Sequence, residues 1–502
     1  MSKFYLTTAI DYVNASPHIG HAMEKILADT ISRYKRLKGE EVLFLAGTDE
    51  HSLKNVRAAE KEKITVKELV DKYAGKFYGL KEILNLSFDD FIRTTEKRHL
   101  LGVQKLWSAC QNDIYKKSYS GLYCVDCEEF YKERELINGL CPEHKTKPEL
   151  IKEENYFFRL SKYQTQLKKF IEKDEVKIIP ETRKNEVLSF INSGLEDICI
   201  SRSSKRASGW GIDVPNDKSQ KIWVWFDALS NYINALGYGE NSEKFNDWWQ
   251  KNKNKLHIVG KDILRFHAVY WPAILLSANL SLPKQIFAHG FIKVNGQKMS
   301  KSLGNVIHPY ELVEKYGTDA VRYFLLAEFP SVEDGDFTYE KLENKYNADL
   351  ANGIGNLFER IFAMAISYKY NYDDSDDYDS EIKDFQEKTE VVYAEKMNNH
   401  QLYEAAITIF SFAKKLDQYI NAHEPWRLIK SRHPKGVGTP TEASEDKNPE
   451  VEKILATLIF GVEKIILWLK PFMPSKMEQA EKYLKNLNSQ SGKLNLFPRL
   501  NS

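Results

Sequence analysis

The first 46 residues follow a pattern that strongly restricts the fold. Residues 3–10 form an apolar run with β-branched side chains, which predicts a strand. A polar turn containing Pro17 follows, and residues 18–38 then carry apolar side chains at helical spacing up to Gly39. The strand predicted at residues 41–46 is apolar from its second residue onward, as in a strand buried on both faces. Strand, helix and strand in this order predict a doubly wound α/β domain with a parallel sheet.

The rest of the chain changes character several times. Between residues 115 and 221, short strands, turns and a cysteine cluster indicate an insertion. The α/β pattern returns after it. The last part is almost wholly helical, and we find no internal repeat. We therefore expect a doubly wound domain in two halves, an insertion between them, a linking region and a helical domain. The predicted segments are residues 1–114, 115–221, 222–290, 291–345 and 346–502.

Charge and cysteine content narrow the class of protein. Lys and Arg (72) nearly balance Asp and Glu (71), so a polyanionic partner would require positive residues gathered on one face. The N-terminus is too polar for a signal peptide, and no apolar run is long enough to span a membrane. The five cysteines, three of them clustered, suit a reducing compartment and a metal site better than a disulfide framework. We expect a cytoplasmic protein without a membrane partner.

A histidine motif lies where the first predicted strand gives way to the helix. His18 and His21 are three residues apart, so both rings can lie on one helix face. The N-terminus of a helix offers backbone N–H groups and a positive dipole end to phosphate, and Gly20 lets a ligand approach the backbone. Taken alone, the pair fits a phosphate site and a structural helix cap equally well.

A second motif, residues 298–302, reads Lys-Met-Ser-Lys-Ser and lies among glycines. Two lysines in such a loop suit a triphosphate, although a match of five residues is more often a solvated basic turn. Together and in this order, the two motifs resemble the signatures of the class I aminoacyl-tRNA synthetases. The resemblance assigns catalysis to His18, His21, Lys298 and Lys301. It assigns ATP binding to these four residues and to Gly20, Gly260, Asp262 and Ser300, with Arg202 supporting the triphosphate.

Four further blocks resemble the methionyl branch of this family: residues 46–51, 223–232, 260–267 and 270–272. The resemblance covers most of the chain. It implies a Rossmann-type catalytic domain with a zinc-knuckle insertion, followed by an all-α anticodon-binding domain, and it places the lysine signature and a stem-contact region in the linking region. It also implies that L-methionine reacts with ATP to give methionyl-adenylate and passes to the 3′ end of tRNA(Met), with Mg²⁺ accompanying ATP.

Aromatic side chains within these blocks suit methionine as the substrate, because a thioether makes favourable contacts with aromatic edges. Each of them taken singly is more often a core residue, but the set favours a pocket. The predicted pocket contains Tyr12, Trp225, Tyr232, Phe266, His267 and Trp271. The resemblance adds Ile10 and Ala228 to its wall and assigns Asp49 to the α-ammonium group of the substrate.

Two close pairs of metal ligands lie in the predicted insertion. Cys124 and Cys127 form the first pair, and Cys141 and His144 the second. Three thiolates and one imidazole at this spacing predict a closed tetrahedral zinc site with a structural role. It resembles the single zinc knuckle found in part of the methionyl family.

Three residues of the helical part have the chemistry to read unstacked bases. Asn356 and Arg360 share a helix face, and Trp426 begins a later helix. On sequence alone, a tryptophan at a helix start is more often a core residue. The resemblance assigns all three to the anticodon. Because no appended domain follows the helical part, we expect a monomer.

The chain departs from the family pattern at two places. Asp11 stands where the family usually carries an aromatic residue or proline, and strand alternation predicts that it points away from Ile10 and Tyr12. The stretch 202–210 is longer and more basic than usual, so Lys205 and Arg206 are candidates for a contact with the tRNA acceptor stem.

Three alternatives explain the chain less well. The leucine, isoleucine and valine enzymes carry a large editing insertion, for which the predicted insertion leaves no room, and the cysteine enzyme carries a zinc thiolate before its first signature. A non-catalytic RNA-binding relative would not need intact histidine and lysine signatures. A small-molecule nucleotidyltransferase does not explain the anticodon residues.

Overall fold

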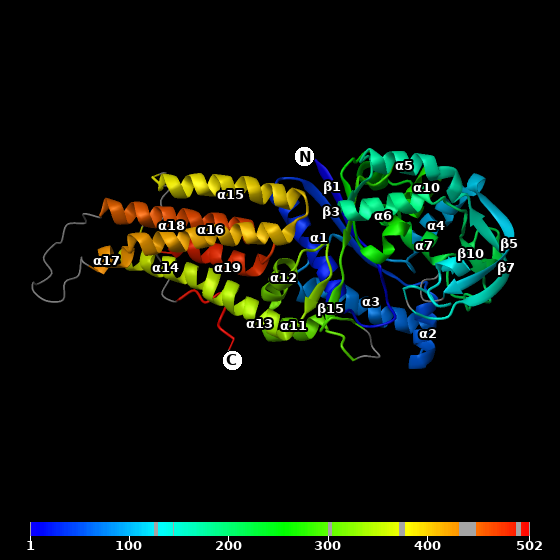
Figure 1. The fold of residues 1–502 in the computed structure, drawn as a ribbon, viewed down its shortest axis with the longest axis horizontal. Helices are drawn as coiled ribbons and strands as arrows, with labels where there is room; N and C mark the ends of the chain where they lie inside the picture. Colours follow the sequence, from blue (N-terminus) through cyan, green and yellow to red (C-terminus); the bar gives the residue numbers. More distant parts are fainter. Residues whose placement is uncertain are drawn as a thin grey trace, which may run out of the picture. The chain divides into compact units, whose positions relative to one another are not determined.

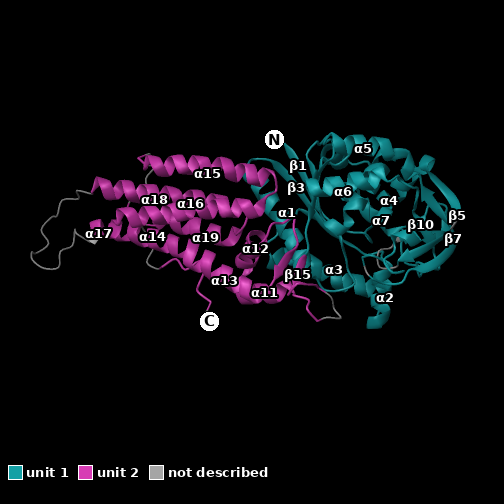
Figure 2. Ribbon diagram, in the orientation of Figure 1, with its two compact units in different colours: residues 1–291 teal, residues 292–502 magenta. Residues whose placement is uncertain are grey.

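The computed structural model describes residues 2–124, 129–143, 145–299, 304–370, 377–430, 448–487 and 493–500. The chain forms two compact units, residues 1–291 and 292–502 (Figure 2). Four predicted site residues, Cys127, His144, Ser300 and Lys301, lie outside the described residues.

A parallel sheet of seven strands forms the centre of the first unit (Figure 1). In sheet order the strands are β2 (Asp11–Tyr12), β3 (Glu41–Asp49), β1 (Lys3–Thr8), β13 (Lys255–Gly260), β14 (Gln285–His289) and β8 (Lys177–Ile179), with β4 (Asp90–Arg93) paired to β3. Every residue of β13 is buried, as in strands covered on both faces. The doubly wound α/β architecture predicted from the sequence is confirmed.

The order of the strands reverses between β1 and β13. From β1 the chain passes through α1 (Ile19–Leu37) to β3 on one side, whereas β13 pairs with β1 on the other side. Tyr5 is in register with Lys255, and Thr7 with His257. In doubly wound sheets, ligands bind outside the carboxyl ends of the strands at such a reversal. The histidine motif lies at this edge, because it begins α1.

Helices cover the sheet and complete a continuous core. Trp249, Trp271 and Phe226 are among the largest fully buried side chains of this unit. The principal helices are α1, α2 (Leu53–Glu62), α3 (Val66–Ile83), α4 (Lys97–Ala109), α7 (Val224–Leu229), α8 (Asn231–Asn234) and α10 (Trp271–Ser277), with a π-helical turn at Phe266–Tyr270 before α10.

The insertion is built on an antiparallel sheet. Its strands, in order, are β6 (Glu129–Tyr131), β5 (Ile114–Cys124), β7 (Glu149–Phe158) and β9 (Ile198–Cys199). A second small sheet contains β10 (Ser201–Ser203), β12 (Asp217–Ile222) and β11 (Asp213–Val214). The helices α5 (Gln164–Glu172) and α6 (Glu181–Asn192) flank β8, which joins the parallel sheet from within residues 115–221.

The second unit is mostly helical, as predicted (Figure 1). It opens with a small sheet of β16 (Gln297–Lys298), β15 (Ile292–Val294) and β17 (Gly335–Phe337). Its helices are α11 (Pro309–Tyr316), α12 (Thr318–Ala327), α13 (Tyr339–Lys345), α14 (Asn356–Tyr368), α15 (Ser380–Asn398), α16 (Leu402–His423), α17 (Pro425–Lys430), α18 (Pro449–Leu469) and α19 (Pro474–Lys485), with a π-helical stretch at Tyr346–Gly355. Among the described residues of both units, no helix is long and apolar enough to cross a membrane.

Candidate active site

His18 and His21 stack on each other at the N-terminus of α1. Their ring centroids are 3.7 Å apart, and the planes are inclined by 22°. The backbone N–H of Gly20 donates to Nδ1 of His18, and the N–H of His18 donates to Nδ1 of His21, each over 3.1 Å. Since Nδ1 accepts in both rings, the neutral forms carry their proton on Nε2. The two rings therefore cap the helix and also present N–H donors.

His21 is a neutral donor rather than a cation. Burial and the nearby Lys25 ammonium lower the pKa of its imidazole to about 3. A quarter of the side chain, 25%, is exposed, so a ligand can still reach the ring. Asp11 contacts Lys25 of α1 at 2.8 Å.

Five of the predicted methionine-binding residues form one aromatic cluster. Trp225 stacks on Phe266 with ring centroids 3.7 Å apart, and the Tyr232 and His267 centroids lie 5.7 Å apart. Trp271 lies 6.2 Å from Tyr232 and has no exposed surface, so it supports the cluster from the core. Ile10, which precedes β2, and Tyr12 of β2 pack against the same core. Ala228 is buried in α7.

His267 is held in one tautomer. Its Nδ1 lies 2.9 Å from the backbone oxygen of Ile263, which can only accept, so Nδ1 carries the proton. Nε2 then accepts from the Tyr232 hydroxyl over 2.7 Å. Burial lowers the pKa of His267 to about 4, so the ring stays neutral. The cluster offers an apolar, uncharged wall.

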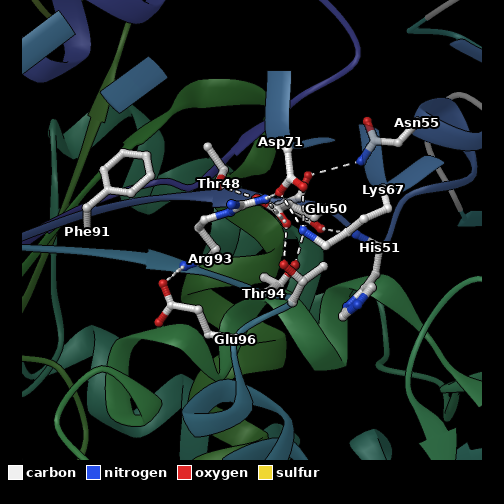
Figure 3. Close-up of polar contacts among 12 residues, drawn as sticks. Thr48, Glu50, His51, Asn55, Lys67, Asp71, Phe91, Arg93, Thr94 and Glu96 are labelled. Atoms are coloured by element: carbon white, nitrogen blue, oxygen red, sulfur yellow. Dashed lines mark hydrogen bonds and ion pairs between the residues drawn. The ribbon is translucent and has the colours of Figure 1, made fainter. Parts of the chain in front are cut away.

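Asp49 is the last residue of β3, and the buried carboxylate of Glu50 follows it in the chain. Asp49 is 3% exposed, and its Oδ1 accepts from the backbone N–H of His51 over 3.3 Å. Figure 3 shows the next residue, Glu50, held by Arg93, whose Nε and Nη2 atoms lie 2.6 and 3.1 Å from its two carboxylate oxygens. Thr48 also donates to Glu50 over 3.0 Å. This network fixes the loop that begins directly after Asp49.

A histidine–aspartate–histidine group, which the sequence analysis did not identify, lies on the other side of this loop. Asp227 accepts from Nδ1 of His51 over 2.7 Å and from Nε2 of His99 over 2.5 Å. Burial alone would raise the pKa of Asp227, but the two histidines lower it to about 2. His51 and Asp227 fall within blocks that resemble the methionyl branch, whereas nothing in the sequence connects them with His99.

The predicted ATP residues are only partly brought together by the structure. Gly260 ends β13, next to β1, and an added Cβ would lie 2.8 Å from Oδ1 of Asp262, so a larger residue here would displace the Asp262 side chain. Arg202 is buried in β10, where it lines a cavity of about 530 Å³ between the insertion and Trp223, Arg265 and Tyr270. None of the signature histidines lines this cavity. Lys298 is exposed on β16 of the second unit. Arg206 turns inward and stacks 3.9 Å above the ring of Tyr123.

Two of the four predicted zinc ligands are described, and both are buried. Cys124 ends β5 at 1% exposure, and Cys141 has none. Thr146 joins them: its hydroxyl lies 3.6 Å from Sγ of Cys124, and its backbone oxygen accepts from the N–H of Cys141 over 2.9 Å. No metal-binding cluster of three ligands occurs among the described residues, from which Cys127 and His144 are missing.

The three predicted anticodon residues lie on α14 and α17, which contact each other. Asn356 is exposed, and Trp426 is only partly buried, unlike a core residue. Arg360 pairs with Asp417 over 2.5 Å and donates to Oδ1 of Asn421 over 3.1 Å. The guanidinium is thus held in place by α16.

Comparisons with known proteins agree over nearly the whole chain. Residues 4–147 and 135–362 match the family described as tRNA synthetases class I (M). The methionine–tRNA ligase of Thermotoga maritima is 42% identical over 487 residues, which cover 95% of this chain and 74% of that protein. The methionine–tRNA ligase of Brucella suis is 42% identical over 490 residues, covering 95% of this chain and 90% of that protein.

Solved structures give the same result. The Mycobacterium tuberculosis methionyl-tRNA synthetase in complex with methionyl-adenylate is 36% identical, with a TM-score of 0.90, covering 99% of this chain and 100% of that chain. The apo form of the Mycobacterium tuberculosis synthetase is 34% identical, with a TM-score of 0.83, and the match covers 100% of this chain and 99% of that chain.

Proposed function

The chain belongs to the methionyl class I aminoacyl-tRNA synthetases, and on that premise we propose how its residues divide the reaction. It activates L-methionine with ATP and transfers the methionyl group to the 3′ end of tRNA(Met). The methionine carboxylate attacks the α-phosphorus, which releases pyrophosphate and forms methionyl-adenylate. The 3′-terminal ribose hydroxyl then attacks the activated carbonyl, which releases AMP.

The observation that carries the assignment is the stacked histidine pair at the sheet edge where β1 and β13 lie side by side. Neutral Nε2–H donors at the positive end of α1 suit the phosphates of ATP. Phosphoryl transfer depends mainly on positioning and on neutralising charge, rather than on a protein acid or base. We assign the phosphates to His18 and His21, with Gly20 allowing close approach, and the ribose to Asp262 beyond Gly260.

The lysine signature supplies positive charge to balance the pyrophosphate. Lys298 and Lys301, with Ser300, are assigned to the pyrophosphate on the strength of the signature itself. Arg202 is assigned to the triphosphate by resemblance alone, since none of the signature histidines lines the cavity that Arg202 lines. ATP binds as its Mg²⁺ complex, and no residue of this chain is assigned to that ion.

The aromatic cluster is assigned to the methionine side chain. Sulfur makes favourable contacts with aromatic edges, and the neutral His267 leaves the wall without charge. Trp225, Tyr232 and Phe266 would contact the thioether, with Ile10, Tyr12, Ala228 and Trp271 completing the wall. Asp49 would bind the α-ammonium group, because its carboxylate ends a strand at the same edge of the sheet.

We also propose a structural zinc ion and an anticodon site. The two buried thiols that Thr146 joins fit a thiolate-rich zinc knuckle completed by Cys127 and His144, and zinc there would cross-link the insertion.

Asn356, Arg360 and Trp426 would read the anticodon, because two of them are accessible and Arg360 is held in place. The clustered cysteines favour a reducing compartment, the cytoplasm.

ATP–pyrophosphate exchange with each of the twenty amino acids tests the assignment. We expect exchange with methionine alone, and a loss of about 10²–10³-fold when His18 or Lys301 is replaced by alanine, as for one transition-state contact. Exchange driven by leucine or isoleucine would overturn the pocket assignment. Near-normal exchange in both alanine variants would overturn the assignment of the signatures.

A further inference from the structure

Asp11 departs from the family pattern, and its carboxylate lies beside the second histidine of the first signature. One Asp11 oxygen is 3.8 Å from Nε2 of His21, and the other is 2.8 Å from Nζ of Lys25. Only 12% of the Asp11 side chain and 5% of the Lys25 side chain are exposed. An isolated buried carboxylate here would repel a phosphate group, because both are negative and little water screens them. The first signature therefore depends on how this charge is balanced.

Lys25 balances the charge from a fixed position. Its Nζ lies 2.8 Å from Asp11, 2.6 Å from Oε1 of Glu24 and 2.9 Å from the backbone oxygen of Ala9. Two of its N–H bonds are accepted by Glu24 and by the backbone oxygen of Ala9, and the ammonium forms an ion pair with Asp11. Burial alone would lower the pKa of Lys25, but the two carboxylates raise it. The ammonium stays charged and cannot turn toward another partner without leaving an acceptor unsatisfied.

His289 is the fourth member of a charged group that also contains Asp11, Lys25 and Glu24. His289, at the end of β14, places Nδ1 2.8 Å from the backbone oxygen of Gly290 and Nε2 3.0 Å from Oε2 of Glu24. A carbonyl oxygen only accepts, and so does an ionised carboxylate, so both ring nitrogens carry protons and the ring is a cation. Burial would raise the pKa of Glu24, but Lys25 and His289 lower it to about 2. Burial raises the pKa of Asp11, and the Lys25 ammonium opposes that rise. With Asp11 ionised, two anions and two cations alternate in this group.

Nε2 of His21 faces Asp11 across 3.8 Å, which is too long for a hydrogen bond, so its N–H bond stays available to a phosphate. Nδ1 of His21 accepts from the backbone N–H of His18, so the proton of the neutral ring is on Nε2, the atom that faces Asp11. The ring also packs edge-on against Phe77 of α3, with centroids 5.1 Å apart. The charged and titratable groups around His21 are His18, Glu24 and Lys25 on α1, Asp11 on β2, and His289 beyond Glu24.

We propose that Asp11 and Lys25 are positioning residues for ATP at the first signature. Asp11 orients the Nε2–H bond of His21, and Lys25 cancels the charge of Asp11 so that the phosphates of ATP can approach. Glu24 and His289 hold Lys25 in place and tie α1 to β14. The proposal rests on the proposed role of His21 in binding ATP.

Kinetics of ATP–pyrophosphate exchange in Lys25→Met, Asp11→Asn and the double variant test the proposal. Lys25→Met exposes the carboxylate, so we expect the KM for ATP to rise about 10- to 100-fold, with the KM for methionine unchanged. The rise should be larger at pH 9 than at pH 6, because the unpaired Asp11 loses its proton as the pH rises. The double variant removes both charges, so its KM for ATP should return to within about threefold of the wild type, while kcat stays low because His21 is no longer oriented.

Asp29→Asn is the matched control. Asp29 lies on the same helix, has no exposed surface and pairs with Arg33 over 2.7 Å. It is about 12 Å further along α1 than His21, given a rise of about 1.5 Å per residue. We expect lower thermal stability in this variant and an unchanged KM for ATP. An equal rise in the control, or no recovery in the double variant, would overturn the proposal in favour of a purely structural ion pair.

Two further measurements separate this proposal from the assignment of the signature. The His21 ring signal can be titrated by NMR in the ligand-free protein. Lys25→Met should raise the pKa of His21, because it removes a cation and exposes an anion, whereas Asp11→Asn should not. If His21→Ala abolishes exchange but both charge variants keep the wild-type KM for ATP and the wild-type His21 pKa, the positioning proposal fails and the signature assignment stands. If His21→Ala keeps normal exchange, the signature assignment itself fails.

Discussion

Replacing Asp227 by asparagine removes a buried negative charge that lies between His51 and His99. The two histidines lower the pKa of Asp227 from the ordinary 3.8 to about 2, against the effect of burial. One pKa unit corresponds to about 1.4 kcal/mol, so the charged form contributes about 2.5 kcal/mol at neutral pH. We expect Asp227→Asn to lower the free energy of unfolding of the first unit by about this amount at pH 7.

The sign of the pH dependence follows from the lowered pKa. Because the folded-state pKa lies below the unfolded one, the contribution is fully present above about pH 4 and is lost as the pH falls toward 2. Urea unfolding of both proteins, followed by tryptophan fluorescence between pH 7 and pH 3, measures the difference. It should stay constant from pH 7 to pH 5 and shrink below pH 4. A difference under about 0.5 kcal/mol at pH 7, or one that grows on acidification, would refute the argument.

Three other changes have defined outcomes. Gly102→Ala should destabilise the first unit by about 1–3 kcal/mol in thermal unfolding, because the new Cβ would lie 1.9 Å from Oδ1 of the buried Asn234. Helix propensity alone would stabilise this variant, so a stabilised variant would contradict the prediction. Arg322→Met should destabilise the second unit by about 2–4 kcal/mol in urea, because its fully buried guanidinium donates to the backbone oxygens of Pro471 and Phe472. A loss of less than about 1 kcal/mol would show that water or repacking replaces these hydrogen bonds. Trp426→Ala should lower the charging of tRNA about 10- to 100-fold with exchange unchanged, since stacking on one base contributes about 1–3 kcal/mol, and an equal loss in both assays would assign Trp426 to folding instead.

Local patterns predicted the parallel sheet because the spacing of apolar residues within a short segment distinguishes a strand from a helix. The apolar runs at residues 3–10 and 41–46 became β1 and β3, and the turn at Pro17 led into α1. The stacked histidines and the aromatic cluster follow from short motifs that also lie close together in the fold.

The partners of buried charges could not be predicted in this way. Glu24 and Lys25 are adjacent in a helix, but their network is completed by His289, 265 positions after Glu24. His99 meets Asp227 across 128 positions. Such pairs depend on which helix packs on which strand, and a single sequence carries no local signal for that choice. The exposure of Trp426 likewise depends on the packing of α17, not on its own neighbours.

The pairing of β1 with β13 has a consequence for biosynthesis. Thr7 and His257 are hydrogen-bonded over 2.7 Å but lie 250 positions apart, and β3 is the only parallel-sheet neighbour of β1 available early in translation. At about 5–20 residues per second, about 10–50 s pass between the emergence of the two strands. During that time one edge of β1 has no native partner. The nascent chain therefore presents an aggregation-prone strand edge to chaperones until β13 has been made.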